Sequence, residues 1–274
     1  MNSLLPSVRL IDTSVAALSF EGQINKILDW ASRKESRSVC LANVHMVMEA
    51  HYDAEFGRVL ERADLVATDG MPLVWLMKAL GVSGQERVAG MDVFLTLCER
   101  AAKQNLKVFF LGSQDSVLDR MCKHLSCDFP ELDVVGWKPL PMISANPELD
   151  EESIREINAS GASLIFVSLG CPKQERWMDI HRGKIQATMI GLGGVFPIYA
   201  GLQKWAPKWM RDCGLEWLFR WMQEPRRLTK RYILTNSAFI WHAGKQILRR
   251  QVDLMSQKPW ISFYGSKRRQ VTKS

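Results

Sequence analysis

Short apolar runs alternate with amphipathic stretches over the first three quarters of the chain. The apolar runs have the length of buried strands and span residues 38–44, 64–70, 106–113, 132–137, 163–170 and 187–194. The stretches between them repeat their apolar residues at helical spacing, over residues 46–60, 71–81, 88–105, 115–126, 151–161 and 171–182. Because nearly continuous apolar strands alternate with helices, the pattern predicts an α/β fold in which a mostly parallel sheet is covered by helices on both faces.

From residue 204 onward, this alternation gives way to helical patterns rich in Trp, Lys and Arg. We therefore predict two parts: a core of residues 1–203 and a basic helical appendage of residues 204–274. The polar and basic end of the appendage, residues 264–274, is expected to form a flexible tail.

Residues 214–233 of the appendage combine aromatic and basic side chains. If this segment is one helix, its apolar side chains form a stripe of Trp217, Leu218, Trp221 and Met222. Three arginines recur at intervals of seven and four residues and form a second face, which consists of Arg220, Arg227 and Arg231. Pro225 either kinks this helix or begins a new one.

Composition and charge narrow the class of protein. The 274 residues are 47% hydrophobic and 24% charged, as in a globular protein. The most apolar stretch, residues 188–202, is too short for a membrane span, which needs about 20 apolar residues. Residues 1–203 hold 20 Lys and Arg against 25 Asp and Glu, whereas residues 204–274 hold 16 against 4. A basic segment of this kind is typical of proteins that meet a polyanion, either nucleic acid or an anionic membrane.

Candidate binding residues lie at the carboxyl ends of the predicted strands, where open parallel sheets bind their ligands. The segments at these ends include Asn43, Thr68 to Gly70, Gly112, Gly170 to Glu175, and Gly191 to Gly194. Glycines there allow backbone N–H groups to approach a phosphate, although any one of them is more simply explained as a turn residue. Several of them on one edge favour a nucleotide ligand.

Asp69 is the sharpest candidate for catalysis. It follows the apolar run that ends at Thr68 and precedes Gly-Met-Pro, whose proline can open a helix. A carboxylate at this edge could act as a general base. Equally well, Asp69 could cap the next helix, as aspartate often does.

The sequence has no motif that holds a divalent metal against a diphosphate. It contains no Asp-x-Asp, and its five histidines have no metal-ligand spacing. Its six cysteines are scattered, which favours reduced thiols over a zinc site. We expect no metal and no other cofactor, so a departing diphosphate would be stabilised by helix N-termini and cationic side chains.

Several segments together resemble the family of bacterial glycosyltransferases named after its teichoic-acid, enterobacterial common antigen and capsule members, TagA, WecG and CpsF. The resemblance runs from about Val39 to about Ile233. Its segments are ATDGMPLVW, ERVAGMDVF, VFFLGSQ, FVSLGCPKQERWM, GLGGVFPIYAG and WAPKWMRDCGLEWLFRWMQEPRRL.

The resemblance implies a Rossmann-like core with an appendage that docks on the membrane and completes the active site. It implies an inverting, metal-independent transferase that moves a sugar from a UDP-sugar to a polyprenyl-diphosphate-linked sugar at the cytoplasmic face of the membrane. The donor in the best-known members is UDP-N-acetylmannosamine or its uronic acid, and the acceptor is GlcNAc on undecaprenyl diphosphate. Other members transfer glucose or glucuronic acid in exopolysaccharide assembly, and the sequence leaves this choice open.

The resemblance also assigns roles to individual residues. Asp69 matches the proposed catalytic base, Gln174 falls in the donor pocket and Arg87 falls beside the acceptor. Arg220 and Arg227 match arginines that grip the lipid-linked diphosphate, and Arg231 lies one residue from a third. The remaining expected substrate contacts are Asn43, Thr68, Gly112, Lys173, Glu175, Gly193 and Gly194. The first strand ends in Leu41-Ala42-Asn43 and lacks the Thr that many members have two residues before Asn43.

Two rival functions are weighed against this one. A Rossmann-type dehydrogenase or methyltransferase predicts a glycine-rich loop after the first strand, where this chain has Ala-Asn-Val-His. A non-enzymatic adaptor for membranes or nucleic acid explains the basic appendage but leaves the sheet-edge residues without a role. We expect no nucleic-acid partner. The oligomeric state stays open, because a neighbouring copy could cover the apolar surface that the appendage covers.

Overall fold

The structure is a computed structural model that describes residues 5–140 and 143–256. The predicted flexible tail, residues 264–274, lies outside the described residues.

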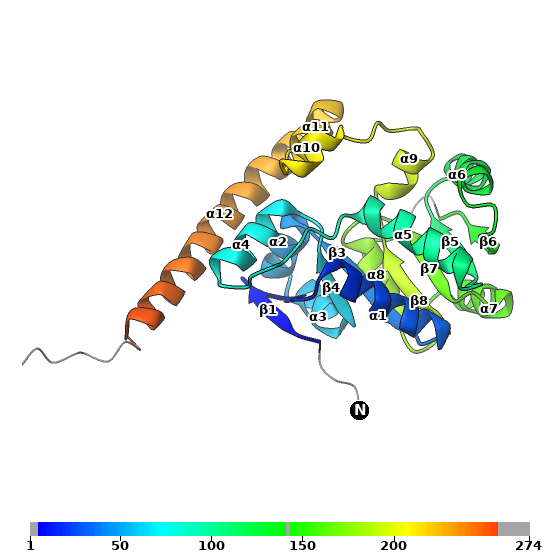
Figure 1. Ribbon diagram of the computed structural model, residues 1–274, viewed down its shortest axis with the longest axis horizontal. Coiled ribbons are helices and arrows are strands. Elements are labelled where there is room, and N and C mark those ends of the chain that lie inside the picture. The colour runs from blue at the N-terminus through cyan, green and yellow to red at the C-terminus, as the bar shows by residue number, and fades with distance from the viewer. Residues whose placement is uncertain (1–4, 141–142, 257–274) are drawn as a thin grey trace, which may run out of the picture.

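Six strands form one parallel sheet in the order β4-β3-β8-β7-β5-β6 (Figure 1). The strands are β3 (Arg37–Ala42), β4 (Leu65–Thr68), β5 (Val108–Gly112), β6 (Val134–Lys138), β7 (Leu164–Ser168) and β8 (Thr188–Gly191). Every neighbouring pair runs parallel. Each strand coincides with one of the predicted apolar runs, so the predicted α/β fold is confirmed.

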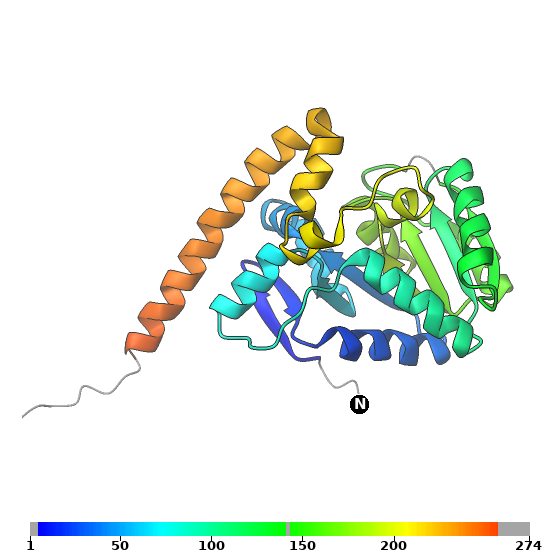
Figure 2. The ribbon, with the colours of Figure 1, turned by 45° about the horizontal axis from the view of Figure 1, so that its top comes forward.

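Both faces of the sheet are buried, which explains why its strands are apolar at successive positions. Along β5, Val108 and Phe110 point to one face while Phe109 and Leu111 point to the other, and all four are buried. The first face packs against α1 (Phe20–Ser32), α5 (Gly90–Lys103), α6 (Asp115–Asp128) and α9 (Val195–Tyr199) (Figure 2). The second face packs against α2 (Val44–Tyr52), α3 (Ala54–Arg62), α4 (Met71–Ala79), α7 (Glu151–Ser160) and α8 (Lys173–His181).

The predicted helix over residues 46–60 is wrong, because two helices, α2 and α3, occupy this segment. Asp53 separates them: its Oδ1 accepts hydrogen bonds from Glu55 N and Phe56 N at 2.9 and 3.0 Å. An aspartate that caps a new helix in this way ends the preceding one. Before α1 the chain also forms a hairpin of β1 (Ser7–Leu10) and β2 (Thr13–Ala16), which the pattern did not predict.

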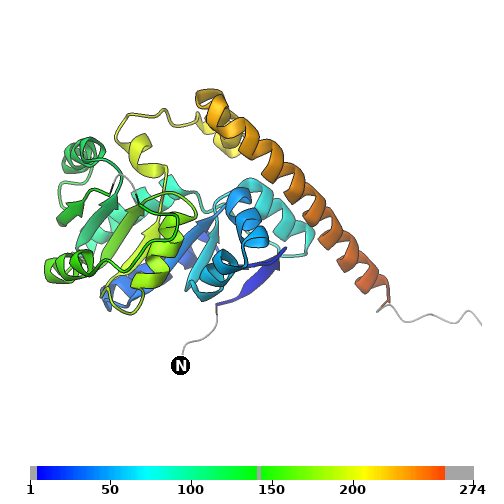
Figure 3. The ribbon, with the colours of Figure 1, turned by 180° about the vertical axis from the view of Figure 1, so that it is seen from behind.

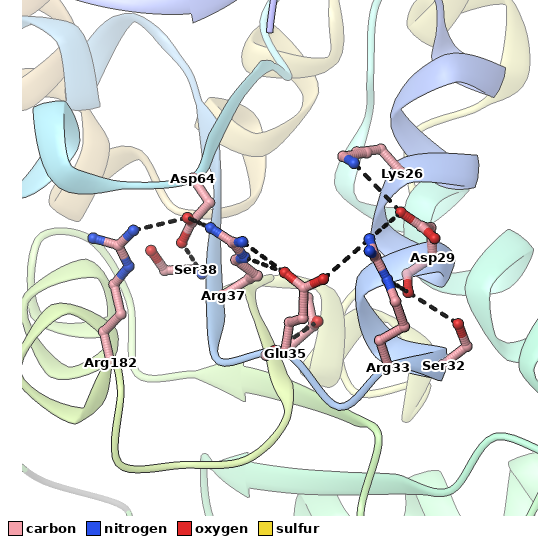
Figure 4. A network of polar contacts seen from close by, with 10 residues as sticks. Lys26, Asp29, Ser32, Arg33, Glu35, Arg37, Ser38, Asp64 and Arg182 are labelled. Atoms are coloured by element: carbon pink, nitrogen blue, oxygen red, sulfur yellow. Dashed lines mark hydrogen bonds and ion pairs between the residues drawn. The ribbon is translucent and has the colours of Figure 1, made fainter. Parts of the chain in front are cut away.

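Ion pairs tie together the amino ends of the strands. Asp64 Oδ1 accepts from Arg37 Nη1 at 2.7 Å and from Arg182 Nη2 at 2.8 Å, and Arg37 also pairs with Glu35 (Figure 4). A surface hollow of about 620 Å³ lies at the same edge, where Arg62 pairs with Asp179. Because carboxylates neutralise these arginines, we assign this edge a structural role. The carboxyl ends of the strands, where open parallel sheets bind their ligands, lie at the opposite edge.

In its described part, residues 204–256, the appendage has three helices, α10 (Lys208–Asp212), α11 (Glu216–Gln223) and α12 (Pro225–Ser256). Of the two alternatives for Pro225, a kink in one helix or the start of a new helix, the structure shows the second. The arginine face predicted for a single helix is therefore wrong, since Arg220 lies on α11 whereas Arg227 and Arg231 lie on α12.

The helix α12 packs on the core through its middle and extends beyond it (Figures 1 and 3). Phe239 and Ala243 are buried in the second core face. Gln246 bonds the hairpin, with Nε2 donating to Arg9 O at 2.7 Å and Oε1 accepting from Ile11 N at 2.9 Å. Within residues 5–140 and 143–256, no helix combines the length and the hydropathy that a bilayer span requires.

Candidate active site

The candidate site lies at the carboxyl ends of β4, β3 and β8, which are neighbours in the sheet. After β3 the chain enters α2 on one face, and after β8 it enters α9 on the other. Helices that leave adjacent strands in opposite directions mark a topological switch point, where open α/β sheets bind ligands. The end of β4 is joined to this point because Asp69 N donates to Ala42 O at 2.8 Å.

Asp69 follows β4 and directs its side chain to the start of α5. Its Oδ1 accepts a hydrogen bond from Gly90 N at 3.2 Å. The alternative that Asp69 caps the next helix is wrong, because α4 has Gly70 as its N-cap and no capping side chain. Burial is the main reason why the pKa of Asp69 rises to about 6, and the negative charge of Glu216 raises it further. Arg87 and Arg220 act in the opposite direction.

Arg87 joins the core to the appendage. It lies in the loop between α4 and α5, and its side chain is only 14% exposed. Its Nη2 donates to Glu216 Oε2 at 2.8 Å, and its Nη1 donates to Arg211 O at 3.3 Å. Both partners belong to the appendage, so α11 is fixed beside Asp69.

Arg220 reaches from α11 over the glycine-rich loop that follows β8. Its guanidinium lies so close to Gly194 that a Cβ at this position would collide with Nη2. Arg220 also acts electrostatically on Asp69. The structure thus brings together Asp69, Arg87, Gly194 and Arg220, four residues predicted from separate parts of the sequence.

Gln174 and Glu175 lie in the first turn of α8, the helix that follows β7, and both are buried. Gln174 Nε2 donates to Glu175 Oε1 at 2.7 Å, and its amide lies against Gly191 and next to Gly193. Burial raises the pKa of Glu175 to about 7, although the bond from Gln174 and the neighbouring Cys171 thiol moderate the rise. These two residues form the floor beneath the loop of residues 191–194.

Four other residues that were predicted to contact the substrate make contacts within the protein. Asn43 Oδ1 caps α2 by accepting from Met46 N at 3.1 Å. Thr68 is completely buried, 3.5 Å from Gln85 Nε2, and Gly112 packs against the backbone of β7. Lys173 Nζ donates to Ile143 O at 2.7 Å. Their roles toward a substrate stay predictions.

The two arginines of α12 are held differently from Arg220. Arg227 is exposed and pairs with Glu224. Arg231 faces α2, where burial first and then the Arg231 charge lower the pKa of His45 to about 4. The structure does not unite Arg220, Arg227 and Arg231 on one helical face, and their predicted contacts with a diphosphate remain untested.

Sequence reasoning missed Glu216. The strongly positive charge of the appendage predicts binding roles for its arginines and none for its few carboxylates. Glu216 nevertheless precedes Arg220 by four residues, which places both on the same side of a helix. This spacing is a signal from which its position could have been predicted.

Comparison with known proteins shows which family the sequence matches. The sequence model described as "Glycosyl transferase WecG/TagA/CpsF family" matches residues 8–253. A relative from Bacillus spizizenii, named N-acetylglucosaminyldiphosphoundecaprenol N-acetyl-beta-D-mannosaminyltransferase, is 31% identical over 191 residues, which are 69% of this chain and 72% of the relative. A protein of the same name from Bacillus subtilis (strain 168) is 26% identical over 201 residues, 72% of this chain and 76% of that protein.

Proposed function

The chain belongs to the WecG/TagA/CpsF family of glycosyltransferases, and from this premise we propose that it transfers a sugar from a UDP-sugar to a polyprenyl-diphosphate-linked sugar. The transfer inverts the anomeric centre and needs no metal. The observation that carries the proposal is the site at the end of β4, where Asp69 lies between the core and the arginine-bearing α11.

The titration of Asp69 suits a general base. With a pKa of about 6, its carboxyl is mostly ionised at pH 7 and is more basic than an ordinary aspartate. Below pH 6 it is protonated and cannot accept a further proton. The rate of transfer is therefore expected to fall as the pH drops through about 6.

The reaction proceeds in one displacement. Asp69 takes the proton from the acceptor hydroxyl while that oxygen bonds to the anomeric carbon of the donor sugar. The bond from this carbon to the β-phosphate oxygen breaks on the opposite face, and its electron pair leaves with UDP. Attack and departure on opposite faces invert the configuration.

Cationic and backbone groups of the site meet the phosphate charges. We assign the departing UDP to the loop of Gly193 and Gly194, with Lys173 available once it leaves Ile143 O. We assign the diphosphate of the acceptor to the arginines of the appendage, Arg220, Arg227 and Arg231.

The names of both relatives support a specific pair of substrates. They name an N-acetylmannosaminyl group as the sugar moved and N-acetylglucosaminyldiphosphoundecaprenol as the acceptor. We propose the same pair for this chain, with UDP-N-acetylmannosamine as donor. A different UDP-hexose or UDP-glucuronic acid is the alternative. The basic appendage supports a peripheral site of action at the cytoplasmic face of the membrane.

Transfer activity tests the proposal. Wild type, Asp69→Asn and Asp115→Asn are assayed with EDTA present, with a panel of UDP-sugars and GlcNAc-diphospho-lipid as acceptor. Asp115 is a suitable control because, like Asp69, it lies between a strand and the helix that follows, but it is exposed at the start of α6. We expect wild-type transfer from one donor, a loss of roughly 10²–10⁴-fold in kcat in Asp69→Asn, and no loss in the control. UDP binding by calorimetry is expected to be unchanged in Asp69→Asn.

Three outcomes would contradict parts of this proposal. Transfer that stops on chelation would overturn metal independence. Full activity of Asp69→Asn would remove Asp69 as the base. The absence of both UDP binding and transfer would favour the adaptor function.

A further inference from the structure

Glu216 is a carboxylate of the appendage that lies beside the charged residues of the core, Asp69 and Arg87. It is the first residue of α11 and is 25% exposed, with Oε2 bonded to Arg87 Nη2 at 2.8 Å. Arg220, one turn later on α11, reaches over Gly194. Two carboxylates, Asp69 and Glu216, therefore share the neighbourhood of two guanidinium groups.

The appendage determines where the Arg87 guanidinium points. Its two terminal nitrogens donate to Glu216 Oε2 and Arg211 O, which are both in the appendage. Arg87 lies three residues before Gly90, whose N–H binds Asp69, so the guanidinium stays in the electrostatic reach of Asp69. An arginine that lost its appendage partners would have Asp69 as a neighbouring carboxylate with which to pair.

Such a pair would weaken the base. A carboxylate that accepts two hydrogen bonds from a guanidinium is stabilised in its ionised form and has less tendency to take a proton. We propose that Glu216 is a positioning residue for the proposed transfer: by holding the Arg87 guanidinium on α11, it prevents an Arg87–Asp69 ion pair and leaves the Asp69 carboxylate available as the base. This inference rests on the proposed function for its catalytic meaning, but not for its electrostatic test.

The charged groups around Asp69 fix the direction of the effect. Glu216 raises the pKa of Asp69, whereas Arg87, Arg220 and the N–H of Gly90 lower it. Replacing Glu216 by Gln removes a nearby negative charge and also frees Arg87 to turn to Asp69. Both changes lower the pKa of Asp69.

The first experiment is a titration of Asp69 by ¹³C NMR of labelled aspartate carboxyls, with the signal assigned from Asp69→Asn. In Glu216→Gln we expect the midpoint to fall by roughly one pH unit, the size of a single nearby charge effect. In Glu216→Gln with Arg87→Gln, the midpoint returns toward the wild-type value, because the freed cation is gone. The control Asp212→Asn removes an exposed carboxylate from the same appendage and leaves the midpoint unchanged.

Glu216→Asp provides a second variant that keeps the charge but shortens the side chain by one methylene, and an intermediate shift is expected. It tests the inference even if Glu216→Gln fails to fold. An unchanged or raised midpoint in the Gln and Asp variants would overturn the inference. So would a double variant that titrates like the single one, because Arg87 would then not mediate the effect.

The second experiment is the pH profile of transfer. Glu216→Gln is expected to lower the plateau of kcat roughly tenfold and to move the acid limb to lower pH, with the KM for the UDP-sugar unchanged. A purely structural role would lower activity without moving the limb and would count against the inference. If wild type transfers no sugar, the proposed function fails, and the NMR titration still decides whether Glu216 keeps Arg87 away from Asp69.

Discussion

Burial raises the pKa of two carboxyl groups, those of Asp69 and Glu175. Their surroundings give them different chemistry. Asp69 lies beside two arginines at the sheet edge, where a substrate could approach it. Glu175 is 1% exposed and has the Gln174 amide and the Cys171 thiol as neighbours. The position of Asp69 therefore agrees with the role proposed for it as a base, whereas Glu175 holds the Gln174 amide in place.

The buried Glu175 predicts a pH-dependent stability. Its pKa of about 7 lies above the ordinary glutamate value of 4.5, so the folded state favours the protonated form. The stabilisation is complete at low pH and is lost as the pH rises from about 4.5 through about 7. Glu175→Gln removes this dependence. Relative to wild type, the variant should gain roughly 2 kcal/mol in unfolding free energy between pH 5 and pH 8.

Urea denaturation at the two pH values measures this difference. Glu131→Gln is the control, since Glu131 is exposed in the loop before β6. Equal pH dependence in wild type and Glu175→Gln would show that Glu175 is ionised in the folded protein at low cost, and the prediction would be wrong.

Individual site residues differ in how far the sequence could predict them. The position of Asp69 could be predicted from the sequence, because an apolar run that ends in a carboxylate and a glycine places that carboxylate at the strand end. The hydrogen bond from Gly90 N to Asp69 could not be predicted, since it depends on how α5 packs against the sheet. The capping role of Asn43 and the burial of Thr68 likewise follow from packing that no local pattern records.

At the scale of elements, the turn between α10 and α11 packs the appendage against the core. Gly214 in this turn has φ of 73°, and a Cβ there would lie 2.9 Å from Met71 Cβ at the start of α4. Met71 follows Asp69 by two residues. The fit of this turn therefore controls how closely α11 approaches the proposed base.

Gly214→Ala is predicted to displace α11. Gly84→Ala is the matched control: Gly84 has φ of 76°, but an added Cβ meets no atom within 4 Å. Both variants should lose about 1–2 kcal/mol of stability, the cost of a left-handed alanine. Only Gly214→Ala should also lower transfer, roughly tenfold or more, because the site is misaligned. Assays of transfer and of trypsin cleavage within residues 204–235 test this, and similar activity in both variants would contradict it.

The sequence predicted the sheet better than it predicted the helices. The inner strands were recognisable because both of their faces are buried, so most of their positions are apolar. The helix boundaries depended on single polar residues: Asp53 divides one predicted helix into α2 and α3, and Pro225 separates α11 from α12. About 150 residues of sequence separate Asp69 from α11, and the two come together only when the appendage packs on the core.

At the scale of the whole molecule, the charge and the exposed apolar side chains are concentrated in the same part of the chain. Residues 204–274 hold 16 of the 36 Lys and Arg. On α12, Leu234, Trp241 and Leu248 are exposed and recur every seven residues, which places them on one side of the helix. Lys245 Nζ lies 4.5 Å from the ring centre of Trp241, an arrangement suited to the headgroup region of a bilayer. We infer that α12 lies on the membrane while α11 covers the site.

This arrangement predicts binding to anionic vesicles that depends on one side of the molecule. Trp241→Ser should weaken binding roughly tenfold, since removal of an inserted indole costs about 1–2 kcal/mol. Trp137→Ser is the control, because Trp137 is also exposed, at 42% against 62% for Trp241, but lies in β6 at the far edge of the sheet.

Co-sedimentation with vesicles that contain phosphatidylglycerol, at low and high salt, measures the binding of wild type and of the two tryptophan variants. Higher salt should weaken binding of all three proteins, because each basic residue near the surface contributes about 1 kcal/mol that salt screens. Equal losses in the two tryptophan variants would mean that α12 does not face the bilayer. The acceptor would then have to reach Asp69 from another side of the molecule, and the assignment of Arg227 and Arg231 to its diphosphate would fail with it.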